Sequence, residues 1–389
     1  MRQRRRHLPM GQPLDVNAAL LGKPGSRERL ATPALVLDLD VLERNLRTMA
    51  DYCRVHGRTL RPHAKTHKST RIAALQAKHG AIGICAATMR EAAAMIASGV
   101  RGVLVTSPMV GAAKLDAAAQ LLALDKNVMF VTDSLIGAKA LEARLKKSRL
   151  SAKVLVDIDV GMRRTGVPNV RAALALARYL DSSNHLELLG IQCYSGMVQH
   201  IGRYADRLRI YGAELALLER ILDQFKRRGL PTQIVSGGGT GTFDIDRQRG
   251  LFTECQAGSY VFMDVQYNEV ELLRRRPLPF ATALFVQAMV LSNNHAGSAT
   301  VDAGFKSFAM DGPVPLVHAG APAGAAFRFY GDEFGMLTWP ARSTRLPLAT
   351  KIEFITPHCD PTVNLHNVYH CVRGDRLVDI WPVDARGPV

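Results

Sequence analysis

The feature of this sequence that most constrains its fold is a regular alternation of short apolar runs with longer amphipathic segments, which begins near residue 32. Eight runs rich in β-branched or apolar residues are predicted to be strands: 34–40, 58–65, 81–88, 102–108, 128–133, 153–160, 186–194 and 233–238. The segments between them have the apolar spacing of helices. This alternation predicts a parallel sheet, and eight repeats over roughly 230 residues favour a closed (β/α)8 TIM-type barrel. An open, doubly wound sheet has the same local pattern and is the alternative.

The pattern changes after about residue 277. Strand-like runs then follow one another, separated by Gly, Pro and Asn turns and without long helices. We therefore predict three parts: a basic, disordered start over 1–31 that leads into a β domain, a barrel over 32–276, and a mostly β C-terminal domain over 277–389. Reactive groups of such barrels lie where the strands end. Polar residues that close the predicted strands are accordingly the first candidates for a site.

Composition argues against several classes of protein. The chain of 389 residues has a net charge of +16, but the excess is spread along it, and only 6% of its residues are aromatic. We therefore expect small anionic ligands as partners and no nucleic acid. No membrane span is expected, because no apolar run approaches the roughly 20 residues needed to cross a bilayer. Six cysteines without close-paired spacing are typical of reduced thiols, so we expect a cytoplasmic protein.

Lys65 is the leading candidate for a reacting group. In an extended chain alternate side chains share a face, so Arg61, His63 and Lys65 would point together. Neighbouring positive charges and burial both lower the pKa of an amine, which prepares a lysine to form a Schiff base with a carbonyl compound such as pyridoxal phosphate. The alternative is a solvated basic loop that precedes a helix, and this segment alone does not decide between the two.

A glycine-rich turn follows the last predicted barrel strand. Consecutive backbone N–H groups and nearby hydroxyls suit a phosphate group, which barrels commonly bind in this position. The candidate phosphate-binding residues are Ser236, Gly238, Gly239 and Thr240. Glycine-rich turns are also common without a ligand, but a position opposite Lys65 favours phosphate binding.

Three further polar residues lie at or after the ends of predicted strands. Arg164, in the loop after the run 153–160, is a candidate to bind an oxyanion of the cofactor. The alternative is a surface arginine. Tyr194 and His200 are candidates to stack on the cofactor ring or to exchange protons near it, whereas a hydrogen-bonded structural role is the alternative for a lone histidine.

His358 and Asp360 form a candidate metal site in the second domain. In an extended chain they would share one face while Cys359 points away, at the spacing of two ligands of a divalent ion. An imidazole and a carboxylate favour Mn²⁺ or Mg²⁺, and Zn²⁺ is also compatible. Two protein ligands suit an open catalytic ion better than a closed structural one. The alternative is a polar turn before Pro361.

Together these segments resemble a family of enzymes that use pyridoxal phosphate and a metal to act on D-configured β-hydroxy amino acids. Its members are D-threonine aldolases, D-3-hydroxyaspartate aldolases and eukaryotic-type D-serine dehydratases. The resemblance runs from residue 32 to 387 and rests on short motifs: RPHAK at 61–65, SGGGTG at 236–241, QAGSY at 256–260, FMD at 262–264, VDAG at 301–304 and HCDPT at 358–362.

The resemblance implies an alanine-racemase-like barrel with a C-terminal β domain. It implies Lys65 as the Schiff-base lysine, a cofactor-binding role for Tyr260, and metal binding by His358 with Asp360. It also implies a homodimer. In this family the dehydratases have a His-x-Cys motif and the aldolases a His-x-Asp motif at the metal site, so by resemblance Asp360 favours the aldolase. Phe334 departs from the family, because relatives commonly have histidine at that place.

The implied reaction is cleavage of the Cα–Cβ bond of a D-3-hydroxy amino acid to glycine and an aldehyde. The metal would bind the β-hydroxyl group, and His200 is the candidate base, with His63 as the second candidate. Three alternatives are a dehydratase that yields a keto acid and ammonia, an amino-acid racemase that needs no metal, and a non-catalytic pyridoxal-phosphate carrier.

Overall fold

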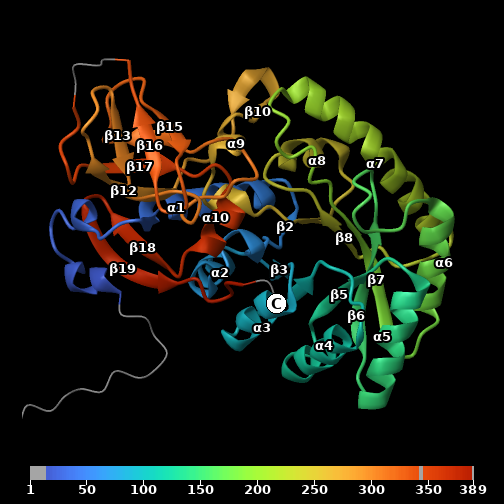
Figure 1. Cartoon of the computed structure of the whole chain (residues 1–389). Helices are drawn as coiled ribbons and strands as arrows, with labels where there is room; N and C mark the ends of the chain where they lie inside the picture. The colour runs from blue at the N-terminus through green and yellow to red at the C-terminus, as the bar shows by residue number, and fades with distance from the viewer. Residues whose placement is uncertain (1–14, 341–344, 388–389) are drawn as a thin grey trace, which may run out of the picture.

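The computed structural model describes residues 15–340 and 345–387, so the basic cluster at 2–6 and most of the predicted disordered start lie outside the described residues. Residues 15–31 of that start are not disordered: they include 3-10 turns at Val16–Leu20 and Arg27–Arg29, and Gly22 N–H donates to Leu377 O at 2.8 Å. Two large sheets follow, one ringed by helices and one mostly antiparallel (Figure 1). In the described part of the chain, no helix is both long enough and apolar enough to cross a bilayer.

The first sheet is a barrel of eight parallel strands. In their order around the barrel they are β2 (Thr59–Leu60), β9 (Glu254–Cys255), β8 (Ile234–Gly237), β7 (Leu186–Cys193), β6 (Ala152–Ile158), β5 (Met129–Thr132), β4 (Val103–Val105) and β3 (Ile84–Ala86). A parallel bridge between His63 and Cys85 joins the end of β2 to β3 and closes the ring. The predicted (β/α)8 barrel is therefore confirmed.

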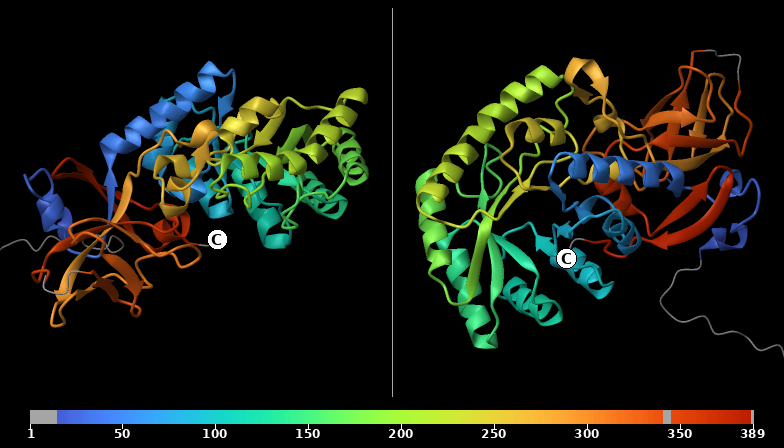
Figure 2. Two further views of the ribbon diagram at one scale, coloured as in Figure 1. Left: turned by 90° about the horizontal axis from the view of Figure 1, so that it is seen from above. Right: turned by 180° about the vertical axis from the view of Figure 1, so that it is seen from behind.

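Helices cover the outside of this barrel, as the view from behind shows (Figure 2). They are α1 (Leu39–Val55), α2 (Thr70–Lys78), α3 (Met89–Ala97), α4 (Ala112–Leu124), α5 (Leu135–Ser148), α6 (Val170–Asp181), α7 (Tyr204–Arg227) and α8 (Phe243–Arg249). Several begin at a polar cap: the side chains of Thr88, Ser134 and Asn169 each accept the N–H group three residues further on.

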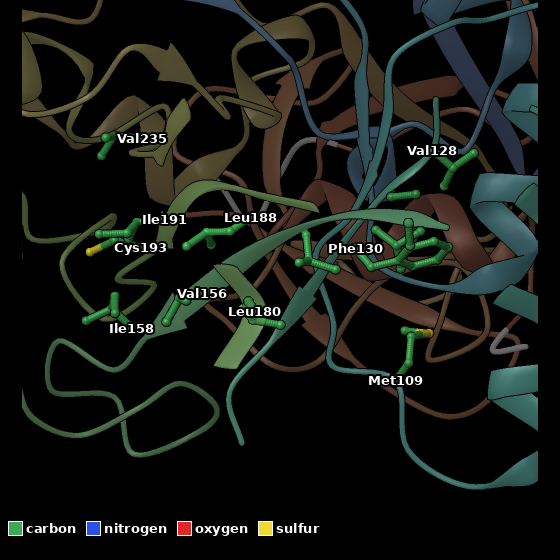
Figure 3. Packing of buried hydrophobic residues seen from close by; sticks show 14 of the residues in the cluster. Met109, Val128, Phe130, Val156, Ile158, Leu180, Leu188, Ile191, Cys193 and Val235 are labelled. Carbon is green, nitrogen blue, oxygen red and sulfur yellow. The ribbon is translucent and has the colours of Figure 1, made fainter. Parts of the chain in front are cut away.

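Both faces of the barrel strands are buried, which explains their nearly continuous apolar runs. Phe130, Val156 and Ile191 pack outward in the large cluster shared with the helices (Figure 3). Met129 and Leu155 belong to a smaller cluster of strand residues that fills the barrel interior. Polar groups can therefore gather only at the barrel ends without loss of core packing.

One predicted barrel strand was assigned to the wrong sheet. β1 (Ala34–Asp38) pairs antiparallel with β12 (Leu284–Ser292) and parallel with β18 (Val368–Arg373), so it belongs to the second sheet. The eighth barrel strand is instead β9, which has only two residues and no readable periodicity. A short apolar run predicts burial but not its partner. As a result, the glycine-rich turn follows the seventh strand of the barrel and not the last.

The second sheet has nine strands and forms the β domain. Besides β1, β12 and β18 it contains β13 (Ser298–Val301), β14 (Leu316–Ala319), β15 (Ala326–Phe329), β16 (Gly335–Thr338), β17 (Lys351–Ile355) and β19 (Arg376–Pro382). Two short helices, α9 (Val265–Asn268) and α10 (Cys359–Leu365), lie near its junction with the barrel (Figure 1). α10 contacts the 3-10 turn Ala64–Thr66 that follows β2, so the junction brings Lys65 close to the predicted metal ligands.

Candidate active site

Lys65 lies in a 3-10 turn where β2 ends, and its amine contacts the Asp360 carboxylate in the first turn of α10. Burial by itself would lower the pKa of Lys65, but the negative charge of Asp360 outweighs it and raises the pKa above its ordinary value. Likewise, burial would raise the pKa of Asp360, but the Lys65 charge lowers it. The predicted depression of the lysine pKa is therefore wrong, because a neutralising carboxylate comes from the other domain.

The predicted cationic face of residues 61–65 does not form either. Arg61 points into the barrel and makes a buried ion pair with Glu254 at 2.6 Å. The ring of His63 caps the 3-10 turn: its Nδ1 accepts the Lys65 N–H at 3.3 Å, and its Nε2 lies 3.1 Å from Thr106 Oγ1. Burial lowers the pKa of His63 to about 3, so this histidine is neutral and both its nitrogens are engaged.

Lys65 opens onto a cavity of about 320 Å³ at the barrel mouth. Arg164 and Tyr194 lie on its wall, with the Arg164 guanidinium 5.6 Å from the centre of the Tyr194 ring. The structure thus brings together three residues that the sequence predicted separately. The volume suits a small cofactor, and most of the side chains that line the cavity around the Lys65 amine are polar.

Sequence reasoning missed the polar floor of this cavity. Gln192 Nε2 donates to Asp157 Oδ1 at 3.0 Å and to Thr106 O at 3.1 Å, and Gln256 Nε2 donates to Ser236 Oγ at 2.9 Å. Gln192 and Gln256 line the cavity, whereas Ser236 is reached only through Gln256. Burial raises the pKa of Asp157 to about 6. An aspartate and a glutamine next to the last residue of two mostly apolar strands, β6 and β7, were the available signal.

The glycine-rich turn supplies two of its predicted residues to the site. Gly239 and Thr240 line a narrow extension of the cavity beside Lys65, together with Gly258. A Cβ atom on Gly239 would lie 2.4 Å from Gln199 Oε1, and one on Gly258 would lie 2.6 Å from Thr66 Oγ1, so the backbone is tightly enclosed. Gly238 instead faces Asp246 with φ +71° and gives the turn its shape. The N–H of Gly239 donates to Thr242 Oγ1 at 3.0 Å and that of Gly241 to Gln199 Oε1 at 2.9 Å, so the Thr240 N–H between them is the backbone donor of this turn that suits a phosphate group.

Tyr260 is buried away from the cavity. Its hydroxyl accepts a hydrogen bond from Gln76 Nε2 at 3.2 Å, and its ring packs against Phe280. Only its backbone N–H, which donates to Thr240 Oγ1 at 3.0 Å, supports the glycine-rich turn. The structure therefore does not bring this predicted cofactor-binding side chain into the site.

We accordingly expect Tyr260→Phe to leave the Kd for pyridoxal phosphate unchanged and to lower the free energy of unfolding by about 1 kcal/mol, since Gln76 loses a buried partner. Absorbance titration and chemical denaturation measure the two effects. Arg164→Leu is the matched control, because it should weaken cofactor binding. A Tyr260→Phe protein with cofactor binding as weak as that control would contradict this placement.

His358 and Asp360 lie at the N-terminus of α10, with His358 as the cap residue. The chain turns helical at Cys359, so the predicted strand-like alternation does not apply here. His358 Nδ1 lies 2.8 Å from Asp311 Oδ2, a partner that sequence reasoning missed. Within residues 15–340 and 345–387, no three or more His, Cys, Asp or Glu side chains gather into a metal site. The pair has the donor chemistry for a divalent ion whose other positions are filled from solvent or substrate.

His200 lies beside this pair. Its ring centre is 6.0 Å from that of His358 and 4.5 Å from that of Tyr267. Burial, followed by the charge of His358, lowers the pKa of His200 to about 4, and its buried Nε2 has no hydrogen-bond partner among the described residues. A neutral imidazole with a free nitrogen can accept a proton, which favours His200 over His63 as a base.

Phe334 lies in the turn that precedes β16 and does not line the Lys65 cavity. Its side chain is 45% exposed, and its carbonyl accepts the Tyr330 N–H at 3.0 Å. The described residues therefore give Phe334 no direct contact with the cavity.

Family models match both parts of the chain. The model of the alanine racemase N-terminal domain matches residues 37–266, and the serine dehydratase domain model matches residues 283–372. The boundaries of these matches separate the barrel from the β domain. The fold, with a lysine at the barrel mouth, thus defines an enzyme of the alanine-racemase-like class.

Individual relatives narrow this class. A 3-hydroxy-D-aspartate aldolase from Paracoccus denitrificans (strain Pd 1222) is 34% identical over 369 residues, which are 94% of each chain. The crystal structure of D-threonine aldolase from Filomicrobium marinum has 34% sequence identity and a TM-score of 0.88, and the match covers 92% of this chain and 96% of that one. A D-threo-3-hydroxyaspartate dehydratase from Delftia sp. (strain HT23) is 28% identical over 90% of this chain and 97% of its own. The chain belongs to the family of D-threonine aldolases, 3-hydroxy-D-aspartate aldolases and related D-serine-dehydratase-like enzymes, which are lyases.

Proposed function

We propose that this enzyme is a pyridoxal-phosphate- and divalent-metal-dependent aldolase that cleaves D-3-hydroxy amino acids of the D-threonine type to glycine and an aldehyde. The observation that carries the proposal is the meeting of Lys65 and Asp360 at the barrel mouth. The amine of Lys65 lines the cavity, and a metal-type carboxylate from the other domain contacts that amine. Aldolases of D-threonine and of 3-hydroxy-D-aspartate, at 34% identity, support the same reaction class.

Different residues around the cavity would bind different parts of pyridoxal phosphate. Lys65 provides the amine for covalent attachment, Arg164 and Tyr194 lie on the wall beside it, and Gly239 with Thr240 would hold the phosphate. Pyridoxal phosphate supplies an electron sink for the bond that breaks at Cα. These cavity residues would fix the orientation of that bond relative to His358 and Asp360.

His358 and Asp360 would hold the metal, with Mn²⁺ or Mg²⁺ favoured by an imidazole and a carboxylate. A divalent ion held there would supply a positive charge that lowers the pKa of the β-hydroxyl group of the substrate. Asp360 pairs with the Lys65 ammonium, and a divalent ion would replace that ammonium as the partner of the carboxylate. His200, neutral and with a free Nε2, would then accept the hydroxyl proton.

A dehydratase is the second candidate function, because the serine dehydratase domain model and a dehydratase relative also match the chain. The two reactions differ in their products. We expect purified protein with pyridoxal phosphate and Mn²⁺ to form glycine and an aldehyde from D-threonine but not from L-threonine, and to stop when a chelator removes the metal.

Product analysis of a panel of D- and L-3-hydroxy amino acids measures this outcome. Keto acid and ammonia in place of glycine would transfer the protein to the dehydratase branch. Racemised substrate with resistance to the chelator would identify a racemase, and cofactor binding without any turnover would identify a carrier. Heat-treated protein with the same cofactor and metal controls for non-enzymatic cleavage.

We further propose that the enzyme acts as a homodimer in the cytoplasm. Several large apolar side chains of the β domain are exposed: Phe305, Met310, Tyr330 and Phe334. A second copy that covers this surface would remove them from water. All six cysteines are buried and unpaired, as suits a reducing compartment. Light scattering of the purified protein measures the mass of the assembly.

A further inference from the structure

The segment Phe262, Met263 and Asp264 connects the barrel to the β domain, and the proposed reaction gives it no role. Met263 has φ +54°, a left-handed conformation that residues other than glycine rarely adopt. Phe262 O accepts the Ala283 N–H at 2.8 Å. This backbone geometry turns the fully buried side chain of Asp264 toward α10.

The two carboxylate oxygens of Asp264 bind two different helices. Oδ1 accepts the Tyr267 N–H at 2.9 Å and so caps α9, three residues away. Oδ2 accepts the N–H of Cys359, the first residue of α10, at 3.0 Å, across 95 positions of sequence. The next residue, Val265, donates its N–H to Thr356 O at 3.1 Å. An ordinary helix cap needs only the first of these contacts.

Each of the two helices carries part of the proposed site. Tyr267 of α9 packs against the ring of His200 and lines the narrow extension beside Lys65. Cys359 of α10 lies between His358 and Asp360, so a shift of its backbone would move both metal-type side chains. Asp264 thus joins, through two hydrogen bonds, the helix that packs against the proposed base to the helix that carries Asp360.

The far side of α10 is also fixed. Thr362 Oγ1 donates to His358 O at 2.8 Å and accepts the Ala309 N–H at 3.0 Å. That contact anchors the segment that carries Asp311, the partner of His358. With these contacts on one side, the first turn of α10 is held on the other side by the Asp264 contact at Cys359 and by the contact of Asp360 with Lys65.

We propose that Asp264 is a positioning residue that holds the proposed metal ligands, His358 and Asp360, at a fixed separation from His200. This inference rests on the proposed function, because the base and the metal ligands that Asp264 would hold apart have those roles only in that proposal. Outer partners of metal ligands commonly contribute tenfold to a hundredfold in metal affinity. Asp264 would act in this way through the backbone N–H of Cys359 and not through a ligand side chain.

Asp264→Asn tests the inference selectively. Asparagine is as good a helix cap as aspartate, so its carbonyl can keep the Tyr267 contact, while its NH₂ group is left against the Cys359 N–H. With cofactor-loaded protein we expect the Kd for Mn²⁺ to rise about tenfold or more and kcat to fall with little change in KM. The absorbance of the Lys65-linked cofactor should stay as in the wild type.

Asp38→Asn is the matched control, since Asp38 accepts two backbone N–H groups at the start of α1, away from the site. It should keep the Kd for Mn²⁺ and kcat of the wild type. If Asp264→Asn does not fold, Asp264→Ser keeps a cap residue on α9 and removes the reach to α10. If the folded Asp264 variant keeps the Mn²⁺ affinity and the kcat of the wild type, this inference is overturned while the proposed function stands. A wild-type protein that binds no Mn²⁺ would overturn the proposed function and this inference with it.

Discussion

Replacement of Lys65 by alanine is expected to abolish covalent attachment of pyridoxal phosphate and to lower kcat by at least about 10³-fold. No other described lysine lines the cavity, and the attached cofactor supplies the chemistry of the reaction. Borohydride reduction followed by mass spectrometry measures attachment, and glycine release measures kcat. Cysteine thiols do not compete with Lys65 for the aldehyde group of pyridoxal phosphate, because all six cysteines are buried.

Lys65→Arg is the control that separates charge from chemistry. Arginine keeps a positive charge near Asp360 but stays protonated and cannot attack a carbonyl group. We therefore expect the same loss of attachment and activity, with a smaller loss of stability than in Lys65→Ala, which leaves the buried Asp360 without its cation. A cofactor that is still covalently bound in either variant would mean that another lysine is the reacting group.

Asp360→Ala is expected to lower kcat by about 10² to 10³-fold, or about 3–4 kcal/mol of transition-state stabilisation, without loss of the attached cofactor. The reason is that the cofactor contacts of Lys65, Arg164 and the glycine-rich turn do not involve this carboxylate, whereas the proposed metal does. Activity is measured over a range of Mn²⁺ concentrations.

Glu333→Ala is the control for this variant, since Glu333 is an exposed carboxylate of the same domain that pairs with Lys306. It should behave as the wild type. If Asp360→Ala recovers wild-type kcat at saturating Mn²⁺, Asp360 affects only metal affinity and not the reaction; full activity in the presence of a chelator would remove the metal from the mechanism.

The barrel could be predicted from the sequence because its strands and helices repeat locally, and buried strands such as β5 and β6 are apolar on both faces. β1 was assigned to the barrel because its apolar run looks the same in either sheet; its partners, β12 and β18, lie far along the chain. β9 was missed because its two residues, Glu254 and Cys255, do not form an apolar run. Pairing over long sequence distances, not local propensity, decided both cases.

Lys65, Arg164 and Tyr194 could be predicted because each lies at or just after the end of a strand, and the structure brings the three together around one cavity. Residues that act through another group were not predicted. Asp311 was missed because only the folded chain brings it to His358. The direction of the Lys65 pKa shift was wrong for the same reason, since the sequence around Lys65 contains cations and its counter-charge lies in the other domain.

The place of β1 between β12 and β18 has a consequence for how this enzyme is made. The barrel is an insertion within the β domain, because one strand of that domain precedes the whole barrel and the rest follow it. During synthesis β1 leaves the ribosome long before its partners exist, so its sheet can form only after the barrel segment is complete. A chain ended near residue 277 would keep β1 with its apolar face unpaired. Lys65 and the pair His358 and Asp360 therefore reach their places only when the whole chain has folded, and neither half of the candidate site can be isolated by truncation.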